Sequence, residues 1–84
     1  MKHELDIYAK YFIAVADGTK TFEVREKRDR NFKIGDWLLL KEIDETSLLY
    51  TVKTILKQIS YILDNENYCK KGYVILGLKT TTEE

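Results

Sequence analysis

The segment that decides the fold class is residues 50–63, which read YTVKTILKQISYIL. Its apolar residues satisfy a helical stripe, but it also contains a β-branched cluster that favours a strand, made up of Thr51, Val52, Thr54 and Ile55. Fully extended, this segment would span roughly 46 Å at ~3.3 Å per residue, which is too long for a small domain. We therefore predict a strand that bends or bulges between Lys53 and Leu56.

Further strands are predicted on both sides of this segment. Residues 36–42, DWLLLKE, are apolar on both faces near their middle, as expected of a strand that crosses a barrel. Residues 73–78, YVILGL, form a last apolar strand, and residues 3–7 alternate polar and apolar side chains as a short first strand. The polar run 44–47 predicts a turn, and residues 64–72 predict a loop.

One helix of about ten residues is predicted after the first strand. Tyr8, Phe12 and Val15 fall at helical spacing, and Gly18 suits the left-handed position that ends a helix. Residues 21–25 then alternate again and predict another strand.

These elements predict a single domain over residues 1–84, of mixed α+β class and mainly β. About five or six short, mostly antiparallel strands should form a small partial barrel, because closure removes exposed strand edges. The N-terminal helix should cover one opening. We expect Phe32 and Ile34 to pin the charged loop 26–35 to the core, and the tail from about residue 80 to fray.

The overall charge and the single cysteine exclude several classes of protein. Fourteen Lys and Arg residues balance fourteen Asp and Glu residues, so a nonspecific nucleic-acid coat protein is not expected. Cys69 is the only cysteine, which excludes an intramolecular disulfide and a multi-cysteine zinc site, and we predict no metal and no cofactor. The opening residues MKHELDIYAK lack a secretory apolar run, and no stretch approaches the ~20 apolar residues of a membrane helix. We expect a cytoplasmic, monomeric protein without a membrane partner.

The functional information is concentrated in residues 18–25, which read GTKTFEVR. Strand alternation places Phe22 and Val24 on an apolar face and puts Glu23 and Arg25 on the opposite, polar face, ~7 Å apart. Arg25 can grip a phosphate or stack on a base, and Glu23 can accept hydrogen bonds from an exocyclic amine. The simplest alternative is an ion pair on a solvated strand, which contributes only ~0–1 kcal/mol.

Lys20, Glu23 and Arg25 match the pattern GxKxxExR, which resembles the signature of the ASCH domain family, of the PUA-like fold. The segments HEL, KTFEVR, FKIGD, YILD and GYVILGLK resemble more closely a small bacterial and phage group, DUF3850. This resemblance implies a β-barrel with a cleft beside the motif strand that binds RNA or a nucleotide-like ligand.

The resemblance and the local charge pattern together nominate the residues of a binding site. We expect an RNA-binding, nucleoside-binding or nucleotide-binding module without chemistry. The residues expected to contact the ligand are Lys20, Glu23, Arg25, Arg28 and Arg30. Further candidates are His3, Thr21, Tyr61 and Asp64.

Two other functions stay open. One branch of the resembled family is similar to a small amidohydrolase that acts on acetylated cytidine, and its catalytic lysine corresponds to Lys20. Glu23 stands where that branch has a threonine, and the loop 64–72 is too short for its helical insertion; an enzyme here would use Lys20 and Glu23 as acid and base. The third alternative is a protein-interaction module in which the motif is structural.

Overall fold

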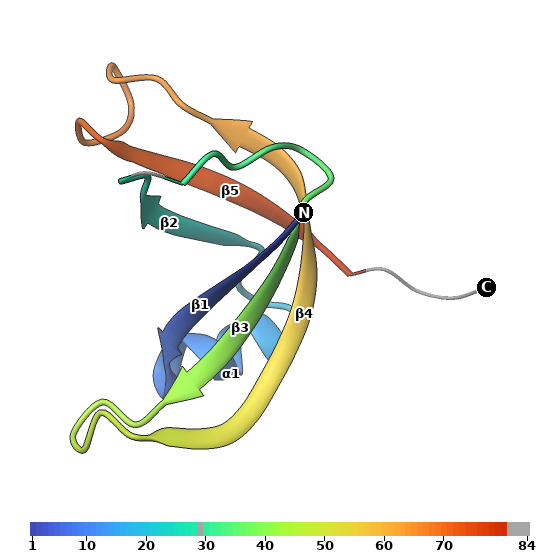
Figure 1. Cartoon of the computed structure of the whole chain (residues 1–84), viewed down its shortest axis with the longest axis vertical. Coiled ribbons are helices and arrows are strands. Elements are labelled where there is room, and N and C mark those ends of the chain that lie inside the picture. The colour runs from blue at the N-terminus through green and yellow to red at the C-terminus, as the bar shows by residue number, and fades with distance from the viewer. Residues whose placement is uncertain (29, 81–84) are drawn as a thin grey trace.

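The computed structural model describes residues 1–28 and 30–80, which form one five-stranded sheet and one helix (Figure 1). The elements in chain order are β1 (Lys2–Tyr8), α1 (Ala9–Ala16), β2 (Phe22–Glu26), β3 (Trp37–Ile43), β4 (Tyr50–Leu63) and β5 (Tyr73–Lys79). The helix has eight residues, two fewer than the sequence suggests. The predicted mainly β partial barrel is confirmed.

The strands lie in the order β1-β3-β4-β5-β2. The β1–β3 pair is parallel, and the other three pairs are antiparallel. β1 and β2 are the two edges of the sheet. The sheet curls into a half-barrel, and these two edges face each other across an open seam (Figure 1). Of the residues described here, no helix is long and apolar enough to cross a membrane.

The long strand β4 joins the two halves of the sheet. Its first part pairs with β3 and its last part with β5, so the strand alternative for residues 50–63 is confirmed. The predicted irregularity in this strand is present, but its predicted position between Lys53 and Leu56 is wrong, because the pairing with β3 is regular from Thr54 to Leu56. The register instead shifts around Val52, whose φ is 68°, and between Ile59 and Tyr61. A parity count along one strand cannot locate these irregularities, because they depend on the partner strands.

The core lies on the concave face of the sheet, under α1. Its fully buried side chains include Leu38, Leu40, Ile59 and Leu76, and the helix contributes Phe12 and Val15. These apolar residues alternate with outward-facing ones, as in a sheet with one buried face.

Strand β2 reverses this rule. Glu23 on its inner face is 4% exposed, whereas Phe22 and Val24 on its outer face are 44% and 51% exposed. The register with β5 sets this orientation, since Glu23 lies opposite the buried Leu76 and Phe22 opposite Gly77. The two faces were predicted, but the polar face is the buried one. The alternative of a Glu23–Arg25 ion pair is therefore confirmed for the pair and wrong for its solvation, because the Glu23 side chain is buried.

The loop after β2 is held at one of its two expected anchors. Phe32 packs against the core and its ring centroid lies 4.7 Å from that of His3. Ile34 is 62% exposed, so its expected anchoring role is wrong. Gly35 next to it has a φ of 96°, and this left-handed turn directs the chain into β3 while Ile34 points outward. The expected fraying of the tail concerns residues 81–84, which lie outside the described residues.

Candidate functional site

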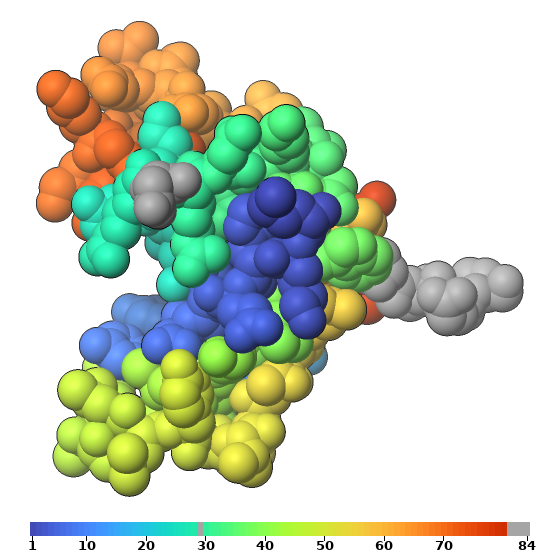
Figure 2. All heavy atoms as spheres, viewed as in Figure 1, coloured from blue at the N-terminus to red at the C-terminus, as the bar shows by residue number. Residues whose placement is uncertain are grey.

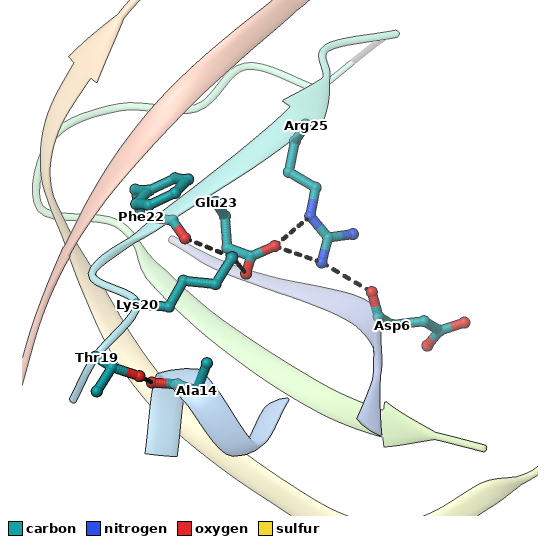
Figure 3. A network of polar contacts seen from close by, with 7 residues as sticks. All are labelled: Asp6, Ala14, Thr19, Lys20, Phe22, Glu23 and Arg25. Atoms are coloured by element: carbon teal, nitrogen blue, oxygen red, sulfur yellow. Dashed lines mark hydrogen bonds and ion pairs between the residues drawn. The ribbon is translucent and has the colours of Figure 1, made fainter. Parts of the chain in front are cut away.

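The centre of the site is the buried carboxylate of Glu23, which holds two cations (Figure 3). Its Oε1 accepts hydrogen bonds from Arg25 Nε at 3.0 Å and is 2.9 Å from Arg25 Nη2. Its Oε2 pairs with Lys20 Nζ. The Lys20 and Arg25 side chains are 17% and 21% exposed, so most of this three-residue network is removed from water.

The local sequence explains how these side chains meet. Glu23 and Arg25 are two residues apart in β2 and therefore point to the same face. Lys20 arrives from the turn that ends α1, where Gly18 has a φ of 87° and the Lys20 N–H donates to the Ala14 carbonyl at 2.9 Å. Its Nζ also donates to the Phe22 carbonyl at 2.6 Å, which fixes the ammonium beside the edge of β2.

Two arginines connect the open edges of the half-barrel. Arg25 Nη2 donates to the Asp6 carbonyl of β1 at 2.8 Å, and Arg30 Nη2 donates to the Glu4 carbonyl at 3.2 Å. These carbonyls are two residues apart on the β1 edge, where no strand pairs with them in the described part of the chain. Side chains therefore bridge a seam that backbone hydrogen bonds leave open.

A groove made of three adjoining pockets runs along β2 at this seam, and Figure 2 shows a hollow between the teal atoms of β2 and the blue atoms of β1 and α1. Three compartments make up the groove. The lysine compartment, of about 390 Å³, is lined by Lys20, Phe22, Tyr11, Glu23 and Val24. The tyrosine compartment, of about 370 Å³, is lined by Tyr8 and Tyr11, by the aliphatic residues Ile7, Val24 and Ile43, and by the charged residues Asp6, Glu23, Arg25 and Glu26. The arginine compartment, of about 320 Å³, is lined by Arg25, Arg28, Arg30, Glu4, Asp6 and Glu26.

Adjacent compartments share lining residues and therefore adjoin one another along β2. Tyr11 borders both the lysine and the tyrosine compartments, and Arg25 borders both the tyrosine and the arginine compartments. Beyond the wall, the Asp6 carboxylate accepts a hydrogen bond from the Tyr50 hydroxyl at 2.8 Å, and this bond raises the pKa of Tyr50. The Asp6 carboxylate, at the mouth of the groove, is therefore already hydrogen-bonded to the first residue of β4.

The structure brings together five of the predicted site residues. Lys20, Glu23 and Arg25 form the network, and Arg28 and Arg30 lie at the arginine end of the groove. Both carboxylate oxygens of Glu23 bind protein cations, and the expectation that Glu23 reads an exocyclic amine of the ligand stays a prediction.

The four further candidates lie away from the groove. His3 is buried beside Asp36, with Nε2 2.8 Å from Oδ2, and this hydrogen bond, together with one from the Lys33 amide, holds the pKa of Asp36 below its usual value. Thr21 is exposed ahead of β2, where its carbonyl accepts from Leu78. Tyr61 lies opposite Gly77 on the outer face, and Asp64 pairs with Lys27 at 3.0 Å.

Sequence reasoning missed the opposite wall of the groove. Asp6, Tyr8 and Tyr11 line it, and the two tyrosines are 39% and 45% exposed. Tyr8 ends β1 and Tyr11 lies in the first turn of α1. From the sequence, Tyr8 served only as a sign of helical spacing, and Tyr11 was not among the candidates for the site. Only the closure of the half-barrel places this stretch opposite β2.

Comparison with known proteins identifies the family. A family model described as "Domain of unknown function (DUF3850)" matches residues 2–78. The chain belongs to this family. The DUF3850 chain is also 35% identical over 74 residues to a protein of Escherichia phage P2, described as "Uncharacterized 12.9 kDa protein in GpA 3'region". The alignment covers 88% of this chain and 64% of the phage protein, so the DUF3850 chain spans just under two thirds of that relative.

Proposed function

We propose that this chain is a binding module for RNA or for a nucleoside or nucleotide, with the ligand in the groove along β2. The observation that carries the proposal is the buried Glu23 carboxylate, which fixes Lys20 and Arg25 in the wall of a groove that also presents exposed tyrosines. Aromatic faces stack on bases, and guanidinium and ammonium groups bind phosphates. The resemblance of GxKxxExR to the ASCH signature agrees with this assignment.

Each member of the network has a separate role in the proposal. Lys20 Nζ uses two of its three donors on Glu23 and the Phe22 carbonyl, which leaves one for a ligand. Arg25 uses Nε and Nη2 for Glu23 and Asp6, and its Nη1 makes no hydrogen bond within residues 1–28 and 30–80. Glu23 positions both cations and does not itself contact the ligand.

The same geometry argues for binding over hydrolysis of an N-acyl group. A general acid or base must reach the proton that it transfers, and both oxygens of Glu23 are held by Lys20 and Arg25. Thr21, which could supply a hydroxyl, lines none of the three compartments. Release of acetate from acetylated cytidine by the purified protein, abolished in Lys20→Met, would reverse this preference.

The proposal is tested by amide NMR titration of the labelled protein with cytidine, acetylated cytidine, cytidine monophosphate and a short single-stranded RNA. We expect shifts confined to residues 20–25 and to the facing residues Tyr8 and Tyr11. Two exposed tyrosines supply matched variants: Tyr11→Ala should weaken binding, and Tyr61→Ala, on the outer face, should leave it unchanged. Silence across the whole panel would overturn the proposal and favour a protein partner.

A further inference from the structure

The three compartments of the groove differ in chemistry, and their order along β2 defines the ligand more narrowly. We infer that the groove takes a single-stranded nucleic acid of at least two nucleotides, with bases in the lysine and tyrosine compartments and a backbone phosphate in the arginine compartment. The inference rests on the proposed function and adds the minimum length of the ligand and the placement of its bases and phosphate.

The arginine compartment is suited to a phosphate because its carboxylates are already engaged. Glu26 pairs with Arg28 at 3.1 Å, and Glu4 pairs with Lys41 at 3.3 Å outside the compartment. Arg30, in contrast, donates only to a backbone carbonyl within the described residues. Its guanidinium can therefore exchange a neutral carbonyl acceptor for a phosphate, which a guanidinium binds through two parallel N–H···O hydrogen bonds.

The other two compartments are suited to flat, apolar groups. The tyrosine compartment offers the rings of Tyr8 and Tyr11 beside the aliphatic residue Val24. Its three carboxylates are already engaged: Glu23 binds Lys20 and Arg25, Asp6 accepts from Tyr50, and Glu26 pairs with Arg28. In the lysine compartment, Lys20 Nζ lies 4.9 Å from the Phe22 ring centroid and 5.7 Å from the Tyr11 ring centroid, within the range of cation–π contacts. A base that enters either compartment meets an aromatic ring and a cation together.

The length of the groove decides against a single nucleoside. β2 has five residues and so extends for roughly 17 Å at ~3.4 Å per residue, and the compartments follow it from Lys20 to Arg28. Each compartment is as large as the smallest ligand sites of proteins, which have volumes of ~300 Å³. One nucleoside can occupy only one of them, whereas a strand of two nucleotides can fill both base compartments. The phosphate on the far side of the base in the tyrosine compartment then reaches Arg25 and Arg30.

The test is fluorescence anisotropy with labelled oligouridylate and oligoadenylate of one to six nucleotides, as RNA and as DNA. We expect affinity to rise at least tenfold between one and three nucleotides and then to level off. If a mononucleotide binds as tightly as a trinucleotide, the inference fails and the proposed function survives. If no oligonucleotide and no mononucleotide binds, both fail.

Salt dependence tests the phosphate contact separately. Each phosphate neutralised on a single strand contributes ~0.7 to the slope of log affinity against log salt, so Arg30→Ala should reduce the slope by about that amount. Arg30→Lys keeps the charge and should keep the slope. Lys33→Ala removes an exposed charge from the same loop, outside the groove lining, and is the matched control. Equal slopes for Arg30→Ala and Lys33→Ala would overturn the assignment of the phosphate to the arginine compartment.

Discussion

Replacing Glu23 with alanine removes the carboxylate that holds Lys20 and Arg25 together. The Glu23 side chain is only 5% exposed, and its two partners are 17% and 21% exposed. The variant therefore leaves two largely buried cations without their counter-charge. We expect both a loss of stability and a loss of ligand binding.

The size of the effect follows from the burial of the network. Removing one partner of a buried ion pair costs ~3–5 kcal/mol, and the partial exposure of Lys20 and Arg25 lets them turn toward water, so we expect about 3 kcal/mol. A chain of this length has a total stability of roughly 4–13 kcal/mol. Since each kcal/mol shifts the Tm of such a domain by ~4–8 °C, Glu23→Ala should lower the Tm by roughly 12–24 °C.

The assay is urea unfolding of the parent and of Glu23→Ala, followed by circular dichroism. Glu45→Ala is the control, because Glu45 also pairs with a lysine, Lys10, at 3.2 Å but on the surface. We expect the Glu45 variant to unfold like the parent. Glu23→Gln keeps the shape and one acceptor, so it should lie between the parent and Glu23→Ala.

A loss of less than about 1 kcal/mol in Glu23→Ala, the range of an exposed ion pair, would refute the buried network. Such a result would mean that water solvates the carboxylate and that the network does not hold the two cations. A double-mutant cycle with Lys20→Met gives an independent measure, because coupling below ~0.5 kcal/mol would contradict a shared buried pair.

Three further outcomes are expected. Arg25→Lys should remain folded but bind a short RNA at least about tenfold more weakly. An ammonium cannot hold Glu23 through two nitrogens and also reach the Asp6 carbonyl. Unchanged affinity in an NMR titration would show that Arg25 does not contact the ligand. The pKa of Asp36 is lowered in the folded state, so its ionised form contributes its full stabilisation above the usual Asp pKa of ~3.9 and loses it as the pH falls through the folded-state pKa. Thermal melts should therefore show that the Tm of the parent falls more steeply with decreasing pH than the Tm of Asp36→Asn. Parallel curves of Tm against pH would contradict this. Val52 has a φ of 68° and is 92% exposed. Val52→Asn should therefore relieve about 1 kcal/mol of backbone strain and raise the Tm by ~4–8 °C. A lower Tm would show that the Val52 side chain makes a stabilising contact.

Several parts of the site could be predicted because they depend on local geometry. Glu23 and Arg25 share a face since strand side chains alternate, and Gly18 ends the helix since it tolerates a positive φ. These features need no knowledge of the rest of the chain. The motif residues were found for this reason.

The errors fall where partners distant in the sequence decide the outcome. His3 was a candidate for the cleft, but the parallel pairing of β1 with β3 places it beside Leu38, and the preceding turn brings Asp36 to it. The register shift of β4 at Val52 depends on β3 in the same way. The neighbours in the fold, and not the residues themselves, set both positions.

The sequence by itself determined the strands, the helix, the family and the two faces of β2, because side-chain periodicity and turn chemistry act over a few residues. Only the tertiary structure decided which face of β2 is buried, since that choice follows from the register of Glu23 opposite Leu76. It also decided that Tyr8 and Tyr11 face the motif across the seam, because β1 and β2 become neighbours only when the sheet curls. Alternation along a strand shows which side chains share a face, and pairing with strands distant in the sequence decides which face is buried.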